Sequence, residues 1–146
     1  MVGRDRMVLH RRLAAEQINI KHMEQRYIAG DLVRYIGVAS PIVVQITEVR
    51  EDNLLIDLGE CNWYLADRSE VDSIRLTGEI LEKNGWKKSR IYFTNRRIPR
   101  IKLCSDEDEI RWSVLINGDI MGDYIFNVHQ LQHILFAFRI EQEIEV

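Results

Sequence analysis

The chain has 146 residues, of which 46% are hydrophobic and 29% are charged, and its formal net charge is −3. This length and composition are typical of one globular domain and exclude a largely disordered chain. No stretch approaches the roughly 18 apolar residues of a membrane span, and the N-terminus lacks the apolar segment of a signal peptide. We therefore expect a cytoplasmic protein with no membrane partner, in which Cys61 and Cys104 stay reduced.

Residues 1–26 are predicted to form a helical N-terminal extension. Good helix formers such as Leu13 and Ala14 fill this segment, but its apolar positions follow one helix face only loosely. Several arginines stand near its start, which is the end of a helix where cations are least favourable. We therefore assign residues 27–146 to a single β-rich domain and residues 1–26 to an appendage.

Short β-strands separated by turn residues are predicted for residues 27–76. Val, Ile, Leu and Tyr fill the strands, while Gly, Asp, Asn, Ser and Pro separate them. Closely spaced short strands indicate an SH3-like small barrel or a curled antiparallel sheet. The predicted strands are Leu32–Ile36, Ile42–Val49, Leu54–Leu58, Trp63–Leu65 and Ser73–Leu76.

A short helix and two hairpins are predicted next along the chain. Thr77 is a suitable N-cap for a helix over Gly78–Asn84, and Gly85 stands where a left-handed C-terminal cap belongs. Pro99 has no N–H to donate, so its strand is expected to lie at a sheet edge or to begin late. Asn117-Gly118 is a strong hairpin signal, because both residues tolerate positive φ. The predicted hairpin strands are Arg90–Thr94 with Ile98–Leu103, and Ile110–Ile116 with Tyr124–Phe126.

A C-terminal helix from about Asn127 to Phe138 is expected to pack on these hairpins. Asn127 is a plausible N-cap, and Val128, Leu131 and Leu135 recur at helical spacing. The predicted fold class is therefore α+β and mainly β, with a small barrel or curled antiparallel sheet, hairpins and a capping helix.

A cluster of basic residues within 83–102 is the main candidate site. This range has eight basic side chains and no acidic one. If its strands pair in register, Arg90, Tyr92, Arg100 and Lys102 share one face, which Arg111 and Ser113 extend. Cations attract phosphates and a tyrosine ring stacks on bases, so one interpretation is nucleic-acid binding. The alternatives are a solvated sheet face and a surface for an acidic protein. The candidate nucleic-acid-binding residues are Lys87, Lys88, Arg90, Tyr92, Arg96, Arg97, Arg100 and Lys102.

The other motifs in the sequence do not predict a catalytic, cofactor or metal site. The acidic run 105–109 lacks the glycine and distal glutamate of a calcium loop, so we interpret it as a solvated turn. His129 and His133 lie on one side of the predicted helix without a third ligand nearby, so we interpret them as surface or interface residues. The nucleophile elbow, the phosphate-binding loop and the dinucleotide fingerprint are all missing from the sequence. We therefore expect no enzyme, no cofactor and no metal.

Three stretches of the sequence have a familiar pattern. Residues 27–33, 74–86 and 126–137 read YIAGDLV, IRLTGEILEKNGW and FNVHQLQHILFA. They resemble, in the same order, the LRIGNYV, IPLTEEILLKNGF and YVHQLQNLYFAL segments of a family of short uncharacterised proteins from phages and prophages of gut Bacteroidales. Arg75 stands where this family usually has proline, and Met23 stands where such proteins usually begin.

The resemblance implies a phage or mobile-element origin, a bacterial host cell, and a β-rich core closed by a helix. It implies no established activity, and it leaves a functional role open for His129, Gln130 and Gln132. Our candidate interaction residues are His129, Gln130 and His133. Our leading hypothesis is a non-enzymatic accessory protein that binds another protein, with a host factor as one possible target. The alternative hypothesis is a nucleic-acid-binding module that uses the basic residues of 83–102.

Overall fold

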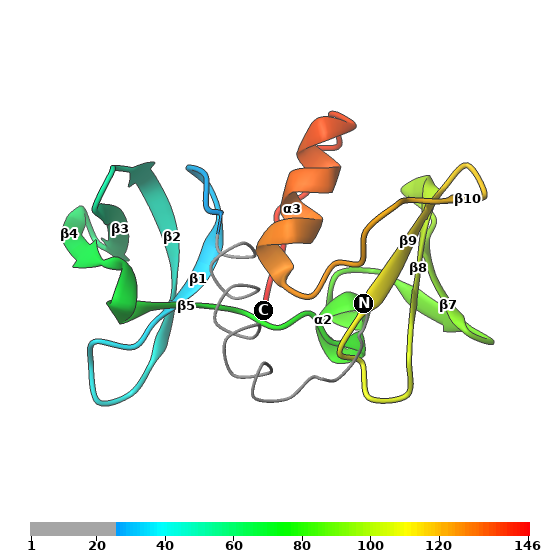
Figure 1. Cartoon of the computed structure of the whole chain (residues 1–146), viewed down its shortest axis with the longest axis horizontal. Coiled ribbons are helices and arrows are strands. Elements are labelled where there is room, and N and C mark those ends of the chain that lie inside the picture. The colour runs from blue at the N-terminus through cyan, green and yellow to red at the C-terminus, as the bar shows by residue number, and fades with distance from the viewer. Residues whose placement is uncertain (1–25) are drawn as a thin grey trace, which may run out of the picture.

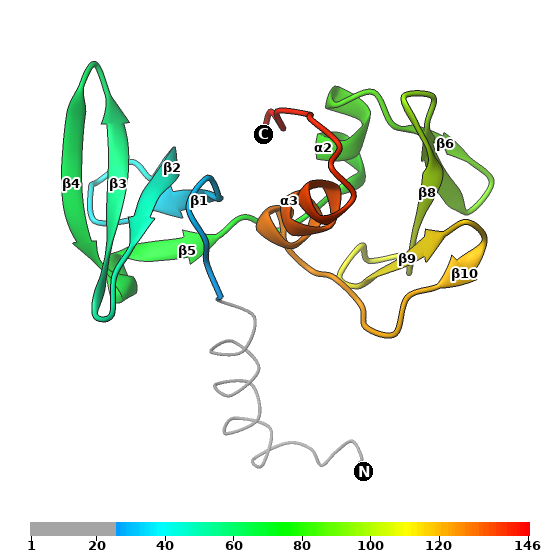
Figure 2. The same cartoon turned by 90° about the horizontal axis from the view of Figure 1, so that it is seen from above.

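A computed structural model describes residues 26–146, so the extension predicted for residues 1–26 lies outside the described residues except for its last position. The described part has two five-stranded antiparallel sheets, and the helix α3 (Val128–Ala137) lies between them. Figure 1 shows the N-terminal sheet on the left and the second sheet on the right, and Figure 2 shows the same arrangement from above. A mainly β, antiparallel fold with a C-terminal helix is thereby confirmed.

The N-terminal sheet has the strand order β4-β3-β2-β1-β5 and is open, since β4 and β5 are its edges. The SH3-like arrangement is therefore not confirmed. Alternation along β2 buries Val44 and Ile46, while Val43 and Gln45 face solvent. The strands are β1 (Leu32–Tyr35), β2 (Ile42–Val49), β3 (Asn53–Gly59), β4 (Asn62–Asp67) and β5 (Val71–Ser73), and the 3-10 helix η1 (Arg68–Glu70) precedes β5.

The last strand of this sheet lies earlier than the Ser73–Leu76 prediction. Residues 74–76 leave the sheet and pair with the segment that leads into α3. Leu76 N–H donates to the Phe126 carbonyl at 3.0 Å, and Val128 N–H donates to the Ile74 carbonyl at 2.7 Å. The apolar residues there are thus buried against the second half of the molecule, a pairing that local sequence pattern cannot indicate.

The second sheet has the strand order β10-β9-β8-β7-β6 and follows the helix α2 (Gly78–Lys83). β6 was not predicted, because two lysines and a serine give no apolar alternation. The strands are β6 (Lys87–Ser89), β7 (Tyr92–Asn95), β8 (Ile98–Ser105), β9 (Trp112–Ile116) and β10 (Asp119–Ile120).

The Asn117-Gly118 hairpin is tighter than predicted. Asn117 and Gly118 have φ values of 54° and 87°, and they connect β9 directly to β10. Two central residues with positive φ are the signature of a type I′ turn. The predicted partner strand Tyr124–Phe126 is wrong, although Ile125 forms an isolated bridge with Trp112.

Pro99 lies in a central strand and not at an edge, since β8 runs between β7 and β9. A register shift explains how the sheet accommodates it. Asn95 pairs with Ile98 whereas Thr94 pairs with Lys102, and pairing with β9 begins at Ile101. Pro99 therefore has no register partner on either neighbour, and its missing N–H removes no ladder hydrogen bond.

The predicted helix caps are confirmed. Thr77 Oγ1 accepts a hydrogen bond from Ile80 N–H at 3.2 Å, and Gly85 has a φ of 90° just after α2. Asn127 caps α3 in a capping box with Gln130.

Two separate hydrophobic cores hold the described residues together. The larger core contains 16 buried residues from the second sheet, its flanking segments and both helices, including Trp86, Trp112 and Leu131. The smaller core contains nine buried residues, all from the N-terminal sheet and the segment before it. The buried hydrophobic residues of α3 all belong to the larger core, while the buried His129 of α3 packs against Tyr27 of the smaller core.

Candidate nucleic-acid interface

Cross-strand register places part of the predicted basic cluster on the solvent side of the second sheet. Lys87 and Lys102 both pair with Thr94, so the three side chains share one face. Tyr92 lies two residues before Thr94 on that face, and Lys102 Nζ lies 5.6 Å from the centre of its ring. We call Lys87, Tyr92, Thr94 and Lys102 the basic face.

Three more arginines lie in the turns at the ends of these strands. Arg90 adopts a φ of 59° between β6 and β7, so it does not share a strand face with Tyr92 as predicted. Arg96 and Arg97 form the exposed β7–β8 turn. Buried Asn95 positions this turn, because its Nδ2 donates to the Asn84 carbonyl at 3.3 Å and its Oδ1 accepts from Arg97 N–H at 2.9 Å. The turn is thus attached to the end of α2.

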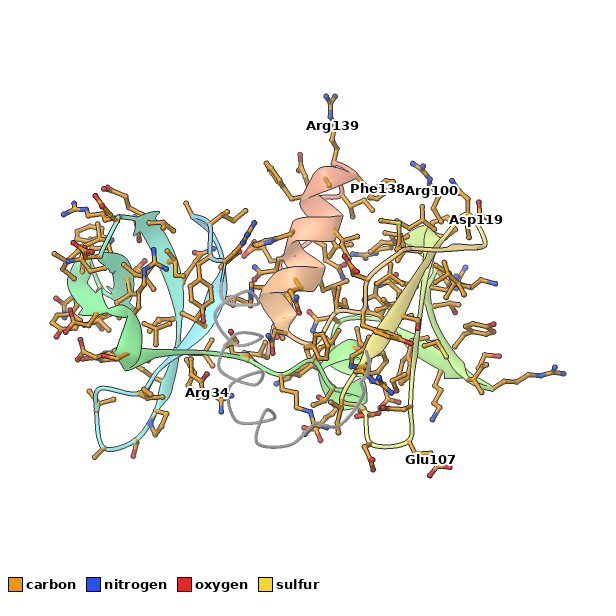
Figure 3. All side chains as sticks on the ribbon, viewed as in Figure 1. Arg34, Arg100, Glu107, Asp119, Phe138 and Arg139 are labelled. Atoms are coloured by element: carbon orange, nitrogen blue, oxygen red, sulfur yellow. The ribbon has the colours of Figure 1, made fainter. Side chains whose placement is uncertain are left out.

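Other cations of the predicted cluster point elsewhere. The Arg100 guanidinium lies 5.2 Å from the centre of the Phe138 ring, beyond the end of α3 (Figure 3). Lys88 pairs with Phe93 on the opposite side of the sheet from Tyr92. Arg111 lies over the Tyr124 ring and 3.8 Å from Asp106, whereas Ser113 does continue the Tyr92 side of the sheet through its pairing with Cys104. The structure therefore limits the predicted nucleic-acid-binding surface to the basic face and the arginines of the two turns.

The basic cluster forms no direct ion pairs with acidic side chains of the described residues. Among residues 26–146, none of the eight cations of 83–102 forms an ion pair with an Asp or Glu side chain. Lys83 donates a hydrogen bond to a backbone oxygen of Val146, and the remaining contacts are with aromatic rings or with Asn117. The cations of the basic face and its turns are therefore available to an anionic ligand.

The acidic run 105–109 has structural contacts of its own. The Glu109 carboxylate accepts a hydrogen bond from Gly78 N–H at 2.9 Å, at the start of α2. Asp106 Oδ1 accepts from Ile110 N–H at 3.1 Å, and Arg75 donates to the carbonyls of Asp108 and Glu109. No group of three metal-ligating side chains occurs within residues 26–146. The run is a turn that organises α2.

The histidines of α3 face the N-terminal sheet. His129 is fully buried, with its ring centre 5.0 Å from that of Tyr27, so it is not a surface residue. His133 Nε2 lies 2.8 and 2.9 Å from the two carboxylate oxygens of Asp31, whose side chain is only 2% exposed. Gln130 Oε1 accepts from the N–H groups of Phe126 and Asn127. All three candidate interaction residues therefore have intramolecular roles.

The side chain of Gln132 completes this junction. Its Oε1 accepts from Leu32 N–H at 2.9 Å, and its Nε2 donates to the Gly30 carbonyl at 3.2 Å. Together with the His133–Asp31 pair it attaches α3 to the start of β1. We call Asp31, Gln132 and His133 the α3 clamp.

A pocket of about 1030 Å³ opens beside the β7–β8 turn, between the end of α3 and the C-terminal residues. Its lining has four basic residues, including Arg96 and Arg97, and four acidic ones, including Glu141 and Glu143. Because these charges balance, the pocket itself does not favour an anionic ligand, although Lys87 and Thr94 of the basic face also line it. The pocket combines segments far apart in the chain, so no local sequence signal indicates it.

Comparison with known proteins finds no matching family model, no matching curated protein and no matching solved structure. The resemblance to phage proteins therefore stays a prediction. Within residues 26–146, the helices are too short or too polar to cross a bilayer.

Proposed function

We propose that this protein binds single-stranded nucleic acid on the basic face of its second sheet. The observation that carries the proposal is a group of cations without acidic partners around a partly exposed tyrosine. Lys87 and Lys102 would contact phosphates, and the Tyr92 ring would stack on a base. Arg90, Arg96 and Arg97 would extend the phosphate contacts from the two turns.

A single strand suits this surface better than a duplex. Duplex readout requires a helix or ribbon that enters a groove, whereas a sheet with an aromatic ring and flanking cations suits splayed bases and a flexible backbone. The N-terminal sheet has the opposite charge balance, which would orient the strand toward the second sheet.

Fluorescence anisotropy with a labelled thymidine 20-mer tests the proposal. We expect binding at micromolar protein in 50 mM salt, and a log–log salt slope of about −0.7 for each phosphate contact. Lys102→Ala should flatten the slope by one contact. Tyr92→Ala should weaken binding by roughly 1–3 kcal/mol, whereas Tyr92→Phe retains the ring and should bind nearly as well.

Arg50→Ala is the matched control, because Arg50 is an exposed cation of the N-terminal sheet that pairs with Glu48. It should leave anisotropy unchanged. Absence of binding at low salt, or equal losses for Arg50→Ala and Lys102→Ala, would contradict the proposal.

His129, Gln130 and His133 have intramolecular contacts, so these three residues do not support the expected protein partner. A non-enzymatic accessory role in a phage or mobile element remains a prediction from the resemblance, and affinity capture from host cells tests it.

A further inference from the structure

The four edge strands of the two sheets differ in how they are protected from pairing with other chains. β5 and β6 have three residues each, and β10 has two. β6 also carries Lys87 and Lys88, and edge lysines oppose strand pairing. β4 has six residues, and its first five, 62–66, are uncharged. β4 is thus the single long edge without such protection among residues 26–146.

The outer edge of β4 is open. Figures 1 and 2 both show this strand at the end of the molecule farthest from the second sheet. No backbone group of residues 62–66 hydrogen-bonds to a described residue outside the β3 pairing. Alternate residues of an antiparallel edge strand direct both N–H and C=O away from the sheet. β4 therefore offers a row of hydrogen-bonding groups to an added strand.

Apolar side chains flank this edge on one side of the sheet. Trp63 is 52% exposed and Leu65 is 41% exposed, and Leu65 pairs with partly buried Leu55 on β3. Trp86 and Trp112 are buried, so Trp63 is the one exposed tryptophan of the three in the sequence. An exposed tryptophan next to leucines is typical of the centre of a protein-binding surface.

The charge around the outer edge of β4 indicates which kind of partner strand this edge would bind. Residues 32–73 carry eight acidic and three basic side chains, a net charge of −5. Asp57 pairs directly with Trp63, and Asp67 and Glu60 stand at the two ends of β4. A basic strand is favoured by this field, whereas a second copy of the same acidic sheet would be repelled.

We propose that β4 binds an extended segment of a partner protein that alternates basic and apolar residues, and that pairs with β4 as a sixth strand. The apolar residues of that segment pack on Trp63 and Leu65, and its lysines or arginines face Asp57, Glu60 and Asp67. Backbone hydrogen bonds supply affinity, and the side chains select the partner.

A peptide titration followed by tryptophan emission tests this proposal. The probe is a blocked peptide of about eight residues that alternates lysine with valine, which is long enough to cover the six residues of β4. We expect a blue shift of Trp63 emission and new amide-exchange protection in residues 62–67. A peptide with glutamate for lysine should bind at least tenfold more weakly, and so should one with methylated alternate backbone nitrogens.

Leu65→Ser should weaken binding of the lysine peptide about tenfold. Ile120→Ser, at a 72% exposed position of β10, should change the affinity for this peptide less than twofold. Absence of a Trp63 shift at millimolar lysine peptide would overturn the proposal. Equal binding of the methylated or the glutamate peptide, or a peptide-free dimer that protects residues 62–67, would also overturn it. Leu65→Ser should leave binding of the thymidine 20-mer unchanged, so this proposal and the nucleic-acid proposal fail independently.

Discussion

The two sheets of this protein have the same number of strands and opposite surface chemistry. Residues 32–73 carry a net charge of −5, whereas residues 87–120 carry eight basic and five acidic side chains, a net charge of +3. The acidic sheet has a long apolar edge, and the basic sheet has short edges. One chain thus presents two different surface chemistries on its two sheets, which a whole-chain charge of −3 conceals.

The two sheets also differ in the size of their hydrophobic cores. The second sheet is covered by α2 and α3 and shares a core of 16 buried residues with them, while the N-terminal sheet has nine. Hydrophobic stabilisation scales with buried apolar area, so the N-terminal sheet has the smaller reserve. We therefore expect the N-terminal sheet to unfold first.

Paired core truncations should produce the largest effects. Leu54 and Leu103 are both fully buried, one in each core. Replacing either by alanine should cost about 2–5 kcal/mol. Leu54→Ala should remove amide-exchange protection from β1–β5 while the second sheet keeps its protection, because Leu54 belongs to the smaller core and the second sheet packs in the larger one.

Leu103→Ala should remove amide-exchange protection from both sheets, since α3 then loses the surface on which it packs. Urea titration followed by Trp63 emission, together with hydrogen exchange, measures both outcomes. If Leu54→Ala unfolds both sheets in one transition, the single cooperative domain predicted from the sequence is correct and the two-core comparison is wrong.

The α3 clamp should give a smaller and more local effect. His133→Leu removes the side-chain partner of the Asp31 carboxylate, which is 2% exposed and keeps, among the described residues, only its hydrogen bond from Ile28 N–H, and a hydrogen bond to a charged group contributes about 1.5–3 kcal/mol. The loss should appear in the unfolding of the N-terminal sheet, because Asp31 precedes β1. Phe136→Ala is the matched control on the same helix, since Phe136 is 76% exposed and should change stability by under about 0.5 kcal/mol. Equal losses for both variants would show that α3 acts through helix stability alone.

Local signals in the sequence predicted those elements whose geometry depends on neighbouring residues. The Thr77 and Asn127 caps, the alternation of Ile42–Val49 and the left-handed Gly85 are all local, and all are confirmed. Non-local pairing accounts for the errors. Residues 74–76 pair with the segment before α3, and Pro99 is tolerated in a central strand by a register shift that no local pattern predicts.

The candidate site shows the same limit. Charge counting located the basic residues, but Arg90 was assigned to a strand face although it lies in the β6–β7 turn with a φ of 59°. The contact of Arg100 with the Phe138 ring, 38 positions later, has no local signal. Helical spacing correctly placed His129 and His133 on one side of α3, yet it did not show that this side faces Asp31 and Tyr27, about 100 residues earlier. The open edge at β4 depends on strand order, which becomes known only when the whole sheet is assembled.

Alkaline pH should distinguish the two sheets by the smallest effect. Tyr27 is buried in the smaller core, with its hydroxyl 2.9 Å from Ser73 Oγ, and burial raises the pKa of this phenol above its usual value of 10.0. The hydrogen bond with Ser73 opposes the increase in pKa, and the nearby charges of Asp72 and Asp31 add to it. The buried residues of the larger core include no tyrosine.

The sign of the pH effect follows from the raised pKa. Below pH 10, Tyr27 is neutral in both the folded and the unfolded chain, so it causes no change in stability with pH. As pH rises above 10 toward the folded-state pKa, the unfolded chain releases the phenolic proton first and the free energy of unfolding decreases.

Tyr27→Phe should flatten this decrease for the N-terminal sheet, measured by Trp63-monitored urea titration at pH 9 and above. It should also cost about 0.5–1.5 kcal/mol at neutral pH through the lost Ser73 hydrogen bond. Tyr64→Phe is the control. The charge of Glu70 is the main cause of the raised pKa of Tyr64, but water and salt screen this interaction at an exposed side chain, so Tyr64→Phe should flatten the decrease less than Tyr27→Phe. An unchanged alkaline slope in Tyr27→Phe would contradict the expected contribution of Tyr27 to the pH dependence of the N-terminal sheet.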